Sequence, residues 1–593
     1  MSQKITNNSE GSNLSSVDVG VIVILAVLQG LIFWLISEAA ERKLWVFDTL
    51  FATLTGYALV FSGPTTFQLT VSFSRSIEAA ISSIFVGIIF GSLAAYISWS
   101  ATVDSQMFAS DTVDSSAVSL FIAWFVLLPF LQCKLERDNF SSDYPRLYYF
   151  AWRNTMTLIL TIIFIGICWM LLFFWGELFD VINVDFFSKL FKEEWFIYCV
   201  TGLFFGLGIV IARTQDRAVE VAHFILLSLL KWLLPVLCLI LVGFLISLPI
   251  TGFDTLLKSR VWSPVGILIA GLVLLVSFVN GVYRDGRQSE AYTKYIDKFI
   301  ALTLIVAPVF ASLCVYGLWI RITKYGWSVD RYWAAVITIL LCAYVFGYAA
   351  TQIASRGNVL RGLGKVNIFV AFCIIGIGII SNTPLMDPMK ISAASQLGRL
   401  IDSSISGSEF DYRYLRRSLG KSGDKALKIL LDREGEEYDL QRRKAALALS
   451  ITSWRSRNSI SDSEKLAALE KVEWIPSNAD RDIGFLQRVA ADRRDRWKIN
   501  DCYWHPEQCR FVSIQLNEDT RNEYFLINKA KNCLRFSSVY AKQDELWMPV
   551  ARIEIQGNCV KVTDMDWDNE IRVETPVWKN IRIGTDDYSV VPE

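Results

Sequence analysis

The sequence predicts an all-α polytopic membrane bundle of about eleven transmembrane helices, followed by a soluble α+β C-terminal domain. Three observations carry this prediction. Hydrophobic residues make up 53% of the 593 residues, above the roughly 45–50% that is usual in soluble proteins. These residues gather in long apolar runs that end near residue 384. Beyond that point the chain shows the capping and alternation patterns of short helices and then strands.

Each predicted span is a run of roughly twenty mainly apolar residues, because a helix rises 1.5 Å per residue across a hydrocarbon core about 30 Å thick. The second run is the most polar, since it contains Asp48 and several threonines, and the sequence does not decide whether it crosses fully. The predicted spans are residues 18–37, 45–62, 79–99, 116–133, 154–177, 195–212, 232–251, 264–283, 298–319, 332–353 and 365–384.

Four regions follow from this pattern. We expect a polar N-terminal tail at 1–17, the transmembrane bundle at 18–384, a helical segment at 385–500 and a small antiparallel β module at 501–593. The first apolar run ends in charged residues without a small-residue cleavage site, so we interpret it as a span and not as a removed signal peptide.

Basic residues in the short loops predict the orientation. The loop at 100–115 contains three Asp and neither Lys nor Arg, whereas the next connection contains Lys134, Arg137, Arg146 and Arg153. Cytoplasmic loops are enriched in Lys and Arg, so we expect the second loop to lie inside. Alternation of the spans then places both C-terminal regions outside the cytoplasm.

Cysteines in the C-terminal region favour disulfides. Four cysteines lie there, namely Cys502, Cys509, Cys533 and Cys559. An even number in an exported domain favours two disulfides, while buried free thiols and a metal site are the alternatives. The C-x2-C spacing of a zinc site is absent from this group. The connectivity of the disulfides cannot be read from the sequence.

Catalytic patterns are scarce. The chain has two histidines, which excludes H-E-x-x-H metal sites and leaves a Ser/His/Asp triad almost no base. We therefore predict no catalytic, cofactor-binding or metal-binding residues and no cofactor. Because acidic and basic residues balance, no nucleic-acid partner is expected. The sequence favours a protein that is not an enzyme.

One predicted outer loop carries more positive charge than its side of the membrane should have. Arg321, Lys324 and Arg331 lie there beside the rings of Tyr325 and Trp327. In one interpretation the loop anchors its two spans at the membrane interface through aromatic and cation–π contacts. In the other, Arg321 or Arg331 docks the helical segment through carboxylates such as Glu409 or Asp411.

Several short motifs resemble a known family. They are WRN at 152–154, TGL at 201–203 with GLG at 206–208, GLWIRI at 317–322, YGW at 325–327, DRY at 330–332, and FDY at 410–412 with YLR at 414–416. Over residues 80–430 the chain is similar to the bacterial inner-membrane family of the domain of unknown function 4153 (DUF4153). The resemblance implies a multi-pass protein of the bacterial inner membrane, and the outside position predicted above for the C-terminal domain is then the periplasm. It implies no activity.

Three functional hypotheses remain. The leading one is a non-enzymatic membrane scaffold or sensor that presents its C-terminal domain to envelope proteins, glycans or lipids, with the lipid bilayer as its first partner. The second is a transporter or lipid-handling protein, because eleven spans exceed what an anchor requires. The third is a membrane-embedded enzyme for a lipid-linked substrate, using outer-loop carboxylates: Asp180, Asp185, Glu193 or Glu194. The oligomeric state stays open.

Overall fold

The structure is a computed structural model that forms two compact units, Met1–Thr452 and Ser453–Glu593. The described residues are 14–44, 47, 49–71, 76–104, 107–137, 144–251, 264–284, 292–354, 362–407, 409–450, 462–491, 500–503, 506–516, 522–530, 533–543, 546–553, 560–561, 581–583 and 586–588.

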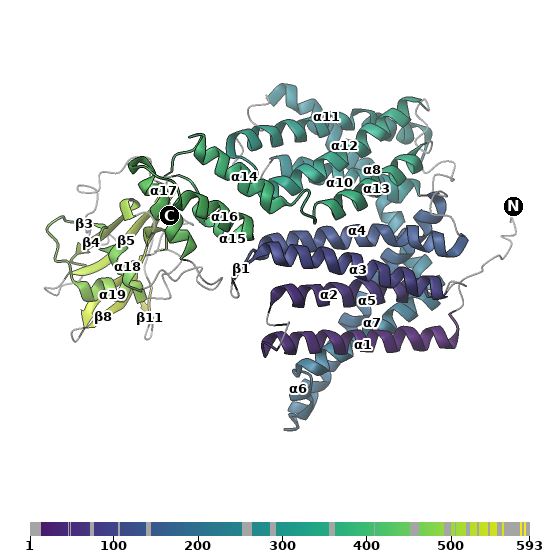
Figure 1. The fold of residues 1–593 in the computed structure, drawn as a ribbon, viewed down its shortest axis with the longest axis horizontal. Coiled ribbons are helices and arrows are strands. Elements are labelled where there is room, and N and C mark those ends of the chain that lie inside the picture. Colours follow the sequence, from purple (N-terminus) through teal and green to yellow (C-terminus); the bar gives the residue numbers. More distant parts are fainter. Residues whose placement is uncertain are drawn as a thin grey trace. The chain divides into compact units, whose positions relative to one another are not determined.

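The first unit contains a bundle of long helices (Figure 1). Among the described residues, ten helices are long and apolar enough to cross a membrane, which confirms the predicted polytopic bundle. The long helices are α1 (Ser16–Glu41), α2 (Leu50–Thr70), α3 (Ser76–Ala101), α4 (Ser110–Arg137), α5 (Tyr144–Asp180), α7 (Glu194–Thr214), α8 (Asp216–Thr251), α10 (Pro264–Tyr283), α11 (Lys294–Tyr325), α12 (Val329–Ala354) and α13 (Leu363–Ile380). The short elements between them are α6 (Phe186–Leu190) and the strands β1 (Thr102–Asp104) and β2 (Met107–Phe108).

Helix α2 is the long helix that does not meet the apolar criterion. Beyond the predicted span, which ends at residue 62, the helix continues through a polar stretch to Thr70. The hydroxyl of Thr66 donates to the carbonyl oxygen of Ser62 at 2.6 Å, and that of Thr70 donates to the carbonyl oxygen of Thr66 at 2.8 Å. Satisfied polar groups can be buried without the cost of an orphaned group, so this half of α2 lies inside the bundle.

Glycines allow several helices of the first half of the bundle to approach closely. A Cβ on Gly202 of α7 would lie 2.5 Å from the carbonyl oxygen of Ala26 in α1, and one on Gly30 would lie 2.3 Å from that of Tyr198. Small residues permit such contact between membrane helices. Gly202 therefore packs the bundle itself.

The second half of the bundle packs through large apolar side chains. Helices α8, α10, α11, α12 and α13 share one buried cluster. Fully buried members include Leu234, Leu275, Leu304 and Val345. Interdigitated side chains of this kind, instead of close backbone approach, hold these helices together.

Four shorter helices follow the last span and belong to the first unit. They are α14 (Pro388–Ile401), α15 (Tyr412–Ser418), α16 (Gly420–Leu431) and α17 (Asp439–Leu449). We call these four helices the cap. Their apolar faces share a buried cluster with Val329 at the start of α12, and Figure 1 shows α14, α15 and α16 at one end of the bundle.

The second unit combines helices with a seven-stranded sheet. Its described elements are α18 (Asp462–Leu469), β3 (Glu473–Ile475), α19 (Ile483–Ala491), β4 (Cys509–Ile514), β5 (Glu523–Ala530), β6 (Cys533–Phe536), β7 (Ser538–Gln543), β8 (Leu546–Arg552), β9 (Val560–Lys561), β10 (Ile581–Ile583) and β11 (Asp586–Tyr588). Apolar side chains of α18 and α19 pack with the sheet around Phe485 and Phe511.

The sheet is mixed, whereas the sequence predicted an antiparallel module. Strands β4 to β9 pair antiparallel, but β3 pairs with β4 in parallel. Helix α19 lies between β3 and β4 in the chain, and such a crossover is what parallel neighbours require.

Candidate functional site

The end of α11 that faces the cap carries a group of polar contacts between cap and bundle. The side chain of Arg399 donates to the carbonyl oxygen of Lys324 at 2.7 Å. The amide of Gln396 donates to the carbonyl oxygens of Tyr325 and Trp327, at 3.0 and 2.7 Å. Two side chains of α14 thus supply donors to three carbonyl groups at the end of α11.

Helix chemistry explains this arrangement. The last carbonyl groups of a helix lack partners within the helix and carry its partial negative charge, so they attract cationic donors. The chain turns away at Gly326, whose φ of +70° suits glycine. A Cβ at this position would lie 2.6 Å from Cδ of Arg399. Gly326 therefore gives α14 direct access to the end of α11.

The predicted loop residues also serve the end of α11. Arg331 donates to the carbonyl oxygens of Tyr325 and Gly326, at 3.3 and 2.8 Å. Its guanidinium carbon lies 5.5 Å from the ring centroid of Tyr325, and the amine of Lys324 lies 5.2 Å from the same ring. The positive charge of Arg321 repels that of Arg331. The backbone of Trp327 donates to the hydroxyl of Ser395 at 2.9 Å.

The carboxylates that we expected as possible partners of Arg331 do not bind it in the structure. Asp411 is the N-cap of α15, where its side chain accepts from the backbone of Tyr414 at 3.0 Å. In the part of the chain that the structure describes, neither Asp411 nor Glu409 forms an ion pair with Arg331. Carbonyl groups at a helix end provide the negative partner instead.

Asp387 joins the cap to α3. Its side chain is 2% exposed and accepts hydrogen bonds from the hydroxyls of Tyr96 at 2.7 Å and Ser100 at 3.0 Å. It also caps α14 by accepting from the backbone of Met389 at 2.8 Å. One buried carboxylate therefore fixes the start of the cap to the end of a bundle helix.

Helices α15 and α16 add further contacts. The hydroxyl of Tyr414 accepts from the backbone of Val329 at 3.0 Å, and Thr112 donates to the carbonyl oxygen of Ser418 at 2.7 Å. Burial raises the pKa of Tyr414. The amine of Lys421 lies 3.9 Å from the ring centroid of Trp99, and burial lowers its pKa. The cap thus contacts α3, α4, α11 and α12.

Two of the four candidate disulfide cysteines are bonded to each other. The structure joins Cys502 to Cys509, with the Cα atoms 5.8 Å apart, and both side chains are buried. Cys533 lies at the start of β6. Because Cys559 is outside the described residues, the second predicted disulfide stays a prediction.

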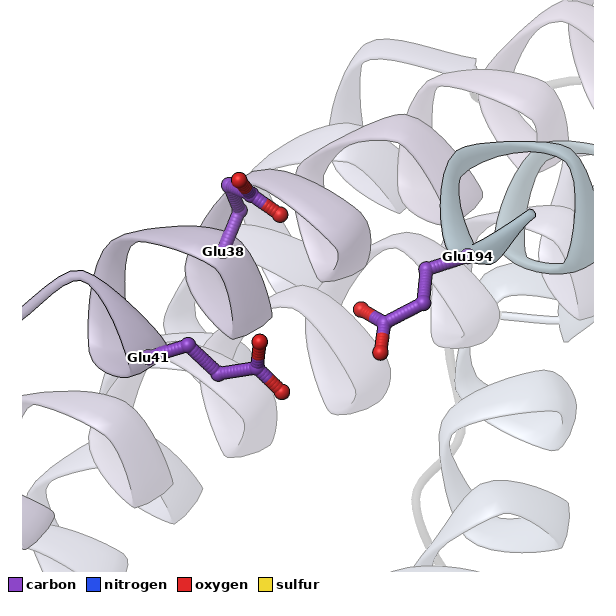
Figure 2. Close-up of side chains that lie close together, drawn as sticks. All are labelled: Glu38, Glu41 and Glu194. Carbon is purple, nitrogen blue, oxygen red and sulfur yellow. The ribbon is translucent and has the colours of Figure 1, made fainter.

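Three carboxylates come together at the end of α1. Oxygen atoms of Glu38, Glu41 and Glu194 lie within 4.8 Å of one another. Figure 2 shows Glu38 and Glu41 on the last turns of α1 and Glu194 extending from the start of α7. Glu38 is already ion-paired with Arg42, and the other two are exposed. This arrangement supports no metal assignment.

The remaining outer-loop carboxylates do not join that group. Asp180 accepts from the hydroxyl of Ser188 at 2.9 Å. Asp185 is ion-paired with Lys189, whose hydrogen bond and charge lower the pKa of Asp185. Glu193 is the residue before α7. Of the four carboxylates proposed for an enzyme, the structure brings only Glu194 into the three-carboxylate group.

Several buried polar residues were missed in the sequence. Asp387 could have been found, because Asp before Pro388 is a helix-start signal. Gln29, Gln68 and Arg213 are also buried in the bundle, and Arg213 donates to the carbonyl oxygen of Gln68. Each of these residues is isolated within an apolar or polar run, so no local sequence pattern predicts its hydrogen-bond partner.

Comparison with known proteins places the chain in a family. No curated protein and no solved structure matches it. The model of the domain of unknown function DUF4153 matches residues 65–430, from within α2 to the end of α16. The matched region therefore includes most of the bundle and three of the four cap helices, and it stops before the second unit. The chain belongs to the DUF4153 family.

Proposed function

We propose that the protein is a non-enzymatic scaffold or sensor of the bacterial inner membrane, which holds its cap against the periplasmic end of the bundle and carries its C-terminal domain on that side. The observation that carries this proposal is the contact between cap and bundle through Asp387, Gln396 and Arg399. A tether would not need buried polar contacts with several spans, whereas a support that sets the position of a domain would.

The orientation rests on charge and on cysteine. The end of α4 and the start of α5 carry Lys134, Arg137, Arg146 and Arg153, while the connection between α3 and α4 has neither Lys nor Arg. This difference favours a cytoplasmic position for the α4–α5 end. The Cys502–Cys509 disulfide suits an oxidising compartment. Both observations support a periplasmic C-terminal domain.

Reporter fusions test the orientation. Alkaline phosphatase fused after residue 593 should be active, and fusions within 134–153 and 284–297 should be inactive. The reverse pattern would overturn the periplasmic placement. To test the role, the full chain and its Asp387→Ala variant are cross-linked in intact cells and the attached envelope proteins, glycans and lipids identified. A defined partner that is lost from the variant supports the scaffold, and an unchanged set of partners contradicts it.

A second candidate function is lipid handling, and a specific cavity favours it. The cavity measures about 270 Å³ and lies between α2, α3 and α4, in the half of the bundle nearer the cap. Its lining is mostly apolar and includes Phe61, Phe90, Leu120 and Trp124. In a membrane, acyl chains are the molecules available to such a space. Transfer of fluorescent phospholipids between the leaflets of reconstituted vesicles tests this function. Ala117 lines the cavity, so Ala117→Leu should lower the transfer rate if lipid passes through it.

A further inference from the structure

A second cavity lies at the opposite end of the bundle. It measures about 240 Å³ and is bounded by α4, α5, α10, α12 and α13. Its position follows from its lining, since Tyr144 begins α5, Asn280 is near the end of α10, and Asn367 is near the start of α13. The other end of α13 leads into the cap. This cavity is therefore separate from the contacts of the cap.

Aromatic rings form much of the cavity wall. They belong to Phe125, Phe130, Tyr144, Tyr148, Trp152 and Tyr344. An apolar cavity of about 150 Å³ can hold benzene, so a space of about 240 Å³ accommodates a ring or a small head group with several carbon atoms. Ligand sites commonly combine such an apolar wall with a few polar groups that fix orientation.

The polar groups of this cavity hold Asn280 in a defined orientation. The side-chain oxygen of Asn280 accepts hydrogen bonds from the hydroxyl of Tyr348 at 2.9 Å and from the amide of Asn367 at 2.8 Å. The amide of Asn367 also donates to the hydroxyl of Tyr144 at 2.6 Å. The Tyr348 hydroxyl shares its one proton between this oxygen and the side-chain oxygen of Asn367. Together with the bond from Asn367, this contact restricts rotation of the Asn280 carboxamide.

Two donors remain at the cavity wall. Within the described part of the chain, the side-chain nitrogen of Asn280 makes no hydrogen bond. The hydroxyl of Tyr344 likewise makes none there, although its ring packs against that of Tyr348 with the centroids 5.7 Å apart. Both residues line the cavity. A ligand that brings an acceptor oxygen would satisfy these donors.

The charge of the wall restricts the ligand further. None of the described lining residues is Asp, Glu, Lys, Arg or His. A charged group inside the membrane is costly without a partner of opposite charge. The wall therefore suits a neutral molecule.

We propose that this cavity binds a neutral amphiphile, whose carbonyl oxygen accepts a hydrogen bond from the Asn280 amide and whose apolar body packs among the aromatic rings. A quinone ring and the ester group of a diacylglycerol share this chemistry. The proposal goes beyond the scaffold function and does not depend on it.

Binding to the purified full chain tests the proposal. After delipidation in detergent, the protein is titrated with decylbenzoquinone, with dioctanoylglycerol and with dioctanoyl phosphatidate, and native mass spectrometry counts the bound molecules. We expect saturable binding of at least one neutral probe and at least tenfold weaker binding of the anionic phosphatidate. Which neutral probe binds more tightly distinguishes a quinone from a glyceride.

Three variants locate the site. Asn280→Leu keeps the number and branching of the side-chain heavy atoms and removes the donor, so it should weaken binding of the neutral probe about tenfold, which corresponds to about 1.4 kcal/mol. Because that change also affects Tyr348 and Asn367, Ala371→Leu provides a second test: it fills the cavity, leaves the polar groups intact and should abolish binding. Ala117→Leu fills the other cavity and should leave binding unchanged. Equal binding by all four proteins, phosphatidate binding as tight as that of the neutral probes, or no binding would overturn the proposal.

Discussion

The two ends of the bundle use buried polar groups differently. At the cap end, Asp387 accepts three hydrogen bonds, and the carbonyl groups at the end of α11 receive donors from Gln396 and Arg399. At the opposite end, the side-chain oxygen of Asn280 accepts two hydrogen bonds, whereas its side-chain nitrogen makes none among the described residues, and Asn280 lines a cavity. A polar group that is hydrogen-bonded within the protein stabilises the fold. A polar group beside a cavity whose donor has no partner in the protein favours ligand binding.

The largest expected loss of stability comes from a substitution at the cap end of the bundle. Asp387→Ala removes a helix cap and leaves two hydroxyls without their acceptor, which should cost about 3 kcal/mol of stability. Limited proteolysis should then cut the 402–411 connection faster. Asp387→Asn keeps a capping oxygen and should show a smaller change. Equal cleavage of the alanine variant and the unmodified chain would show that Asp387 does not hold the cap.

A glycine at the same interface should give the next largest effect. Gly420 has a φ of +50°, and a Cβ there would lie 2.3 Å from the carbonyl oxygen of Ser100. Gly420→Ala should destabilise the cap by about 2 kcal/mol, measured by thermal unfolding of the purified protein. Gly398→Ala is the matched control in α14, because nothing lies within 4 Å of its added Cβ. Identical unfolding temperatures for the two variants would rule out close contact at Gly420.

A donor from α14 should matter less. Arg399→Ala removes one hydrogen bond from the end of α11, and charged donors are worth about 1.5 kcal/mol or slightly more. Chymotrypsin cleavage next to Tyr325 and Trp327 should accelerate. Lys390→Ala changes an exposed cation on the same helix and should leave cleavage unchanged. A result in which both variants behave alike would contradict specific capping of α11 by Arg399.

The opposite end should show the smallest effect, in a matched pair of tyrosines. Tyr348→Phe removes a hydroxyl bonded to Asn280 and Asn367 and should lower stability by about 1 kcal/mol. Tyr344→Phe removes a hydroxyl without a hydrogen bond in the described residues and should stay within about 0.5 kcal/mol. Thermal unfolding compares them, and a larger loss for Tyr344→Phe would reverse our assignment of the unused donor.

The bundle was predictable because a span needs only a local property, a long apolar run. The same criterion does not detect the polar half of α2, since Thr66 and Thr70 look unfavourable until their hydrogen bonds within the helix are known. The parallel pairing of β3 was missed because a strand of three residues carries no period. Local patterns thus predict elements better than they predict partners.

The contacts of the cap were only partly predictable. Aromatic and basic residues at the end of α11 and the start of α12 drew attention to Arg331 and Tyr325, but the partners expected for Arg321 or Arg331 were carboxylates. The observed partners of Arg331 are backbone carbonyl groups, which have no sequence signature. Likewise, nothing near Gln396 or Arg399 in the chain indicates that these residues contact the end of α11. Their partners there lie 71 and 75 residues earlier in the sequence.

Hydrogen exchange of two backbone amides tests the docking of the cap most directly. Trp327 lies between helices and Val329 is the first residue of α12, so neither amide has a partner within a helix. Both donate to cap side chains, Ser395 and Tyr414. We predict slow exchange of both amides in the full chain. The amide of Glu194, which starts α7 without a side-chain cap, should exchange quickly. If Trp327 and Val329 exchange as fast as Glu194, the cap is not docked on the bundle.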